Sequence, residues 1–60
     1  MKRETLARYM ECAEDLRIEL ADELMSGELS EEDYKEVRGI YKSAGELYVA
    51  LNHFRIKRGM

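Results

Sequence analysis

The fold of this chain is decided by one turn-forming stretch, Leu24-Met25-Ser26-Gly27-Glu28-Leu29-Ser30-Glu31-Glu32-Asp33-Tyr34. Gly27 suits the left-handed conformation that ends a helix, because glycine has no Cβ to clash there. Ser30 can cap the helix that follows, and Asp33 stands where a capping box places its acid. The acids at 31–33 would also stabilise the start of that helix, because they lie at the positive end of its dipole. The stretch therefore predicts a helix end, a tight turn and a helix start.

The residues before this turn carry the pattern of an amphipathic helix. Apolar side chains recur at spacings of three, four and seven residues, which places them on one helical face. They are Leu6, Tyr9, Met10, Ala13, Leu16, Leu20 and Leu24. The pattern predicts a first helix over about 4–26.

The residues after the turn repeat at seven-residue intervals along three tracks. The tracks are Tyr34, Tyr41 and Tyr48; Val37, Ala44 and Leu51; and Ile40, Leu47 and Phe54. They predict a second helix over about 31–56, and its wide apolar stripe needs neighbours on two sides, as in a bundle. Gly39 and Gly45 cost about 1 kcal/mol each relative to alanine in a helix interior. Each is either a tolerated weak spot or a point where another segment approaches closely.

Folding the chain at the turn aligns residues whose numbers sum to about 57. The facing pairs are Leu6 with Leu51, Met10 with Leu47, Ala13 with Ala44, Leu16 with Tyr41, and Leu20 with Val37. The central layer then pairs alanine with alanine, which means either a close helix approach or a void that a second hairpin fills. We therefore expect an all-α, two-helix antiparallel hairpin that dimerises into a four-helix bundle. A chain that folds only on a partner is the alternative.

The apolar residues of both helices are the expected core and dimer interface. They are Leu6, Met10, Ala13, Leu16, Leu20, Leu24, Tyr34, Val37, Ile40, Tyr41, Ala44, Leu47, Tyr48, Leu51 and Phe54. The regular spacing of the three tyrosines favours a place in this core over a role as platforms for nucleic-acid bases. Ile18 and Val49 lie off both stripes, and if exposed they would mark a second contact surface for a partner.

The size of the chain also points to assembly. Its 60 residues form a single domain, 1–60, whose own core is marginal. One cysteine allows no intrachain disulfide, and one cysteine with one histidine makes a poor zinc site, so oligomerisation or partner binding has to supplement the core. No window reaches the roughly 18 apolar residues of a membrane span, and the charged N-terminus does not look like a signal peptide. We expect a cytoplasmic protein without membrane contact.

The charges are unevenly distributed. The first helix carries Glu4, Glu11, Glu14, Asp15, Glu19, Asp22 and Glu23, but only two bases, Arg8 and Arg17. This acidic face either keeps the assembly soluble or docks a basic partner. The net charge of −3 argues against a general nucleic-acid binder.

Five of the other eight bases gather near the termini, which lie together in an antiparallel hairpin. They are Lys2, Arg3, Arg55, Lys57 and Arg58. This basic end lies opposite an acidic turn, so a second hairpin packed in the opposite direction would place unlike charges side by side. The acids of this acidic turn are Asp22, Glu23, Glu28, Glu31, Glu32 and Asp33. Binding of RNA or DNA phosphates by the basic end is the alternative function.

The sequence offers no motif for catalysis. It has no glycine-rich phosphate loop, no Cys-x-x-Cys, no paired histidines at helical spacing and no nucleophile motif, so we expect no enzymatic activity, cofactor or metal. Cys12 and His53 should not meet, because the hairpin register sets Cys12 opposite about residue 45. Cys12 is read as a small hydrophobe at the edge of the stripe, and His53 as a solvent-facing residue.

Local matches extend this pattern to a known family. Ala7-Arg8-Tyr9 and Ala44-Gly45-Glu46-Leu47-Tyr48, with Leu29 at the turn, resemble the Rop-like helical hairpins of plasmids and viruses. The resemblance implies an antiparallel four-helix-bundle homodimer. It does not extend to RNA binding, because Ala13 and Leu20 stand where that family places a glutamine and a lysine when Tyr9 is aligned with its aromatic residue. The turn also resembles those of short bacterial helical-hairpin interaction modules. We expect a non-enzymatic adaptor or regulatory protein that binds an unidentified protein partner.

Overall fold

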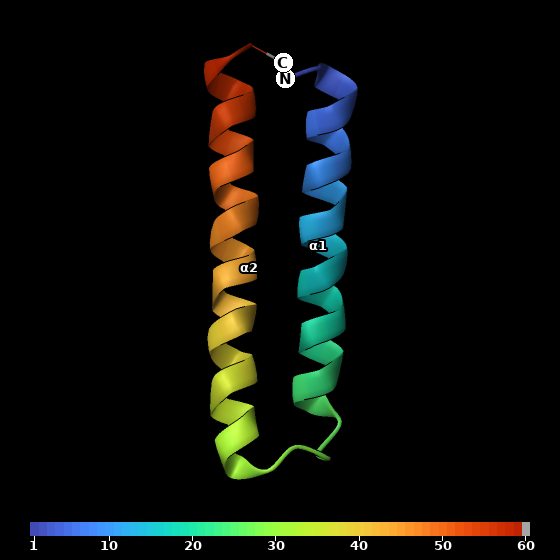
Figure 1. Ribbon diagram of the computed structural model, residues 1–60, viewed down its shortest axis with the longest axis vertical. Coiled ribbons are helices and arrows are strands. Elements are labelled where there is room, and N and C mark those ends of the chain that lie inside the picture. Colours follow the sequence, from blue (N-terminus) through green and yellow to red (C-terminus); the bar gives the residue numbers. More distant parts are fainter. Residues whose placement is uncertain (60) are drawn as a thin grey trace.

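The computed structural model describes residues 1–59 and is a hairpin of two helices. Helix α1 spans Arg3–Met25 and helix α2 spans Glu31–Lys57. They lie side by side and antiparallel in a molecule 43 Å long, joined by one short connection (Figure 1). The predicted all-α hairpin is confirmed, and each helix boundary lies within one residue of its expected place.

The turn is held by the residues that the sequence singles out, together with Ser26. Gly27 adopts a φ of 75°, the left-handed conformation expected after α1. The Ser26 hydroxyl donates to the Glu23 carbonyl at 2.7 Å and accepts the backbone N–H of Glu28 at 3.2 Å. At the start of α2 the Ser30 Oγ accepts the backbone N–H of Asp33 at 3.1 Å. Backbone groups that the helix ends leave without helical partners are thus bonded locally.

Small side chains are buried in the middle of the hairpin. In the described part of the chain the fully buried residues are Leu6, Ala13 and Ala44, with 1%, 3% and 4% of their surface exposed. Ala13 and Ala44 are the two residues that the hairpin register pairs in the middle of the molecule. Such an alanine layer buries little apolar area, so two helices alone make a thin core.

The two glycines of α2 differ in the space around them. A Cβ built on Gly39 meets nothing within 4 Å, and one built on Gly45 meets only the Cδ of Arg17 at 3.8 Å, an ordinary contact. Packing within this chain therefore requires a glycine at neither position. Across residues 1–59, neither helix has an apolar stretch that could cross a membrane.

The glycines give a paired test of the fold. Gly39→Ala should raise the free energy of unfolding by about 1 kcal/mol, because alanine is the better helix former and its methyl group meets no neighbour. Gly27→Ala should lower it by about 1 kcal/mol, because a Cβ is strained at a φ of 75°. Urea unfolding followed by circular dichroism, at one fixed protein concentration, measures both. A destabilised Gly39→Ala variant would mean that another segment packs on Gly39.

The alanine layer gives a second test. Ala44→Glu would place a carboxylate at a site that is 4% exposed, and should lower the free energy of unfolding by roughly 3 kcal/mol. Glu19→Lys, on an exposed residue of α1, is the control and should change it by no more than about 0.5 kcal/mol. Equal unfolding curves for the two variants would contradict the observed register.

Candidate functional site

The titratable and nucleophilic residues are dispersed over the hairpin. No group of three or more histidine, cysteine or acidic side chains within residues 1–59 is arranged to hold a metal ion. Cys12 is exposed and lines a groove with Tyr9 and Leu16, whereas His53 lines a different hollow with Arg17 and Lys42. The structure thus does not bring Cys12 and His53 together, and the candidate sites are surfaces.

One side of the hairpin carries a hollow of about 300 Å³, which we call the apolar groove. Its lining is Tyr9, Cys12, Ala13 and Leu16 from α1, with Leu47 and Leu51 from α2. No charged side chain is among these residues. The apolar groove is therefore an uncharged surface that both helices form, and it is a candidate contact surface.

The apolar groove exists because each helix presents a stripe wider than its partner covers. Six residues at heptad spacing are buried or half-buried between the helices: Leu6, Ala13, Leu20, Val37, Ala44 and Leu51. Four others, each three residues further along a stripe, are Tyr9, Leu16, Ile40 and Leu47, and between 45% and 53% of their surface is exposed. Within residues 1–59 the two helices thus cover one row of each stripe and leave the second row about half exposed.

Most of the remaining members of the expected interface are partly buried. Met10, Leu24, Tyr41, Tyr48 and Phe54 are half-buried, and Tyr34 is exposed.

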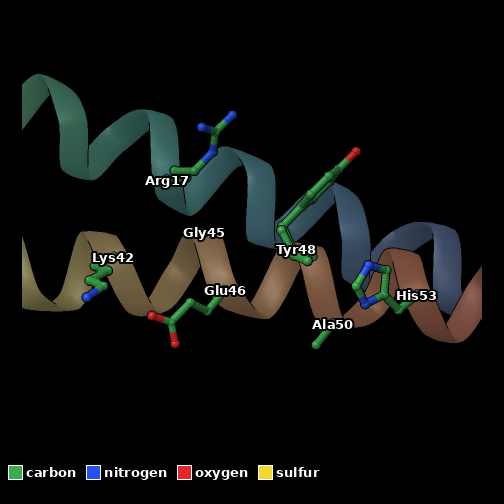
Figure 2. A pocket seen from close by; sticks show the side chains of 8 residues that line it. Arg17, Lys42, Gly45, Glu46, Tyr48, Ala50 and His53 are labelled. Atoms are coloured by element: carbon green, nitrogen blue, oxygen red, sulfur yellow. The ribbon is translucent and has the colours of Figure 1, made fainter.

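The other side of the hairpin is polar, and Arg17 is one of the residues that line it. Its Nη2 donates to Glu14 Oε1 at 2.8 Å, and its Cδ lies 3.8 Å from the position that a Cβ on Gly45 of α2 would take (Figure 2). The pKa of Arg17 is raised, first because Glu14 accepts this hydrogen bond and carries a negative charge, with a smaller contribution from the Tyr41 phenol. Arg17 therefore stays cationic, and its guanidinium is held by an acid of its own helix.

Two shallow hollows on this polar side meet at Lys42, and we call them together the cationic groove. One, of about 570 Å³, is lined by Lys35, Arg38, Gly39, Tyr41 and Lys42. The other, of about 640 Å³, is lined by Arg17, Lys42, Gly45, Glu46, Tyr48, Val49, Ala50 and His53 (Figure 2). No sequence motif predicted a site at Lys35, Arg38 and Lys42. Their spacing of three and four residues, which places them on one helical face, is the signal that could have found them.

The two aliphatic residues off the stripes are both exposed, at 51% each. Val49 lines the larger hollow of the cationic groove, whereas Ile18 lies on α1 and is not among the residues that line it. The structure therefore assigns Val49 to a defined surface, and Ile18 to the acidic face of α1.

The bases of the basic end do gather at one end of the hairpin, where the start of α1 meets the end of α2 (Figure 1). Lys2, Arg3, Lys57 and Arg58 are exposed. Arg55 is half-buried and donates to Asn52 Oδ1 through Nε at 3.2 Å and Nη2 at 3.0 Å, and it lines a small hollow with Arg3. The Arg58 guanidinium lies 5.2 Å from the centre of the Phe54 ring.

Comparison of the chain with protein-family models, with curated proteins and with solved structures finds no match. The resemblance to the Rop-like hairpins therefore stays a prediction. Function has to be argued from the apolar groove, the cationic groove and the basic end.

Proposed function

We propose that this chain is a non-enzymatic adaptor or regulatory protein of the cytoplasm that acts as a homodimeric four-helix bundle. In this proposal the dimer is the working form, and it binds a protein partner through its outward faces, which include the acidic face of α1 with Ile18 and the side of α2 with Val49. The observation that carries the proposal is the apolar groove, with its row of half-exposed residues.

Symmetry favours a second copy as the occupant of the apolar groove. In a two-fold dimer the same patch of both chains meets itself, so a groove built only of uncharged side chains suits this contact. Burying a leucine or isoleucine side chain is worth about 1.5–3 kcal/mol. Each copy would bring Leu16, Ile40 and Leu47, together with Tyr9, into a core that the single hairpin leaves thin.

Charge favours one direction of packing. The basic end and the acidic turn lie at opposite ends of the 43 Å hairpin. A second hairpin running the opposite way places each basic end beside an acidic turn, whereas one running the same way places like charges together. The proposed dimer is therefore antiparallel, the arrangement that the resemblance to the Rop-like hairpins also implies.

Mass measurement tests the dimer. Light scattering after size-exclusion chromatography should give twice the chain mass at micromolar concentration. The double change Leu16→Glu and Leu47→Glu should give the single-chain mass with reduced helicity, because it places charges in the apolar groove. Glu19→Lys, outside the groove, is the matched control and should keep the dimer mass. A folded wild-type chain of single mass would contradict the proposal.

The basic end supports a second candidate function, the binding of RNA or DNA. Five bases meet there, and four of them are exposed. Salt dependence separates this candidate from protein binding, because the logarithm of the affinity falls by about 0.7–0.9 per phosphate contact for each tenfold rise in salt.

Charge reversal tests this second candidate. Changing Arg55, Lys57 and Arg58 to glutamate should abolish binding of labelled RNA and DNA, measured by fluorescence anisotropy, because it replaces three cations with anions at the end of α2. Arg8→Glu, on an exposed residue of α1, is the control. Binding that survives the triple change would defeat this candidate.

A further inference from the structure

The cationic groove concentrates positive charge on a chain that is negative as a whole. The net charge is −3, yet residues 35–42 of α2 hold three bases and one acid, whereas α1 holds seven acids and three bases. Lys35, Arg38 and Lys42 are exposed. The ion pair found within residues 1–59 joins Arg17 to Glu14, so none of these three cations is paired inside the described chain.

Glycine lines both hollows of the cationic groove. Gly39 lies among the three cations and Gly45 beside Val49. Gly39 weakens α2 by about 1 kcal/mol relative to alanine. Since no contact within the chain requires a glycine there, its physical effect is to leave the backbone of α2 open to close approach from outside.

We propose that the cationic groove binds an acidic amphipathic helix of a partner protein. This inference rests on the proposed adaptor function and names the chemistry of its partner. Lys35, Arg38 and Lys42 span about 10 Å along one face of α2, so acids at the same helical spacing on the incoming helix would meet all three.

The rest of the groove fits a helix better than a nucleic acid. Val49, two turns beyond Lys42, offers an aliphatic contact that a phosphate backbone would not use, and Ala50 beside it is small. Gly39, where an added Cβ would meet nothing within 4 Å, allows a second helix backbone to approach. The acids of α1 repel a long polyanion, whereas a short helix with an apolar end can lie on α2 alone.

The probe is a labelled helical peptide with three glutamates at the spacing of Lys35, Arg38 and Lys42, and a leucine at the place that faces Val49. Fluorescence anisotropy should show saturable binding to the wild-type protein. Lys42→Glu, at the residue shared by both hollows, should weaken it about tenfold. Arg8→Glu makes the same charge change on α1 and should leave the affinity unchanged.

Gly39→Leu tests whether close approach at Gly39 contributes to peptide affinity separately from charge. The added side chain starts in open space, so mass and helicity should be retained, while the affinity for the peptide should fall about tenfold because the floor of the groove is filled. Affinity equal to wild type in this variant would overturn the proposed close contact.

Two further probes complete the test. A peptide with lysine in place of each glutamate should not bind, and equal binding of both peptides would overturn the proposal. A labelled RNA that binds in a Lys42-dependent way while the acidic peptide does not would overturn it in favour of nucleic acid. Light scattering on the same samples keeps the two proposals apart, because a dimer that binds no peptide defeats only this inference, and a folded single chain defeats the bundle.

Discussion

The contact of Ala13 with the α2 stripe at Ala44 is the constraint on which the rest of this structure depends. Two methyl groups allow the helices to approach closely, and this approach buries both alanines almost completely. The close approach sets how the helices are rotated, with one row of each apolar stripe inside the hairpin. The same geometry turns the second row, with Leu16 and Leu47, outward into the apolar groove. The second row is thereby left about half exposed.

The two sides of the hairpin have opposite chemistry, and each follows from its residues. The apolar side is uncharged and suits a copy of itself, since a two-fold contact brings identical surfaces together. The polar side holds the Arg17–Glu14 pair, which ties one cation down, and it leaves Lys35, Arg38 and Lys42 unpaired within the described chain. Self-association and partner binding would therefore use different faces, so that a dimer could carry two partner sites.

Most of the fold could be predicted because its signals are local. The turn depends on Gly27 and Ser30, whose conformation and capping bond involve residues at most three positions away. The helices follow from a periodicity that any single stretch of chain displays. The cationic groove was not predicted, because Lys35, Arg38 and Lys42 look like an ordinary solvated face until the hollow around Gly39 is seen.

The sequence by itself determined the two helices, their boundaries, the turn and the separation of charge between an acidic α1 and the basic part of α2. These properties depend on neighbours along the chain. Only the tertiary structure decided which row of each stripe is buried, that Arg17 lies over Gly45, and that Gly39 opens into a groove between cations. The reason is that rotation of a helix about its own axis is set by contacts across the hairpin, and no local pattern specifies it.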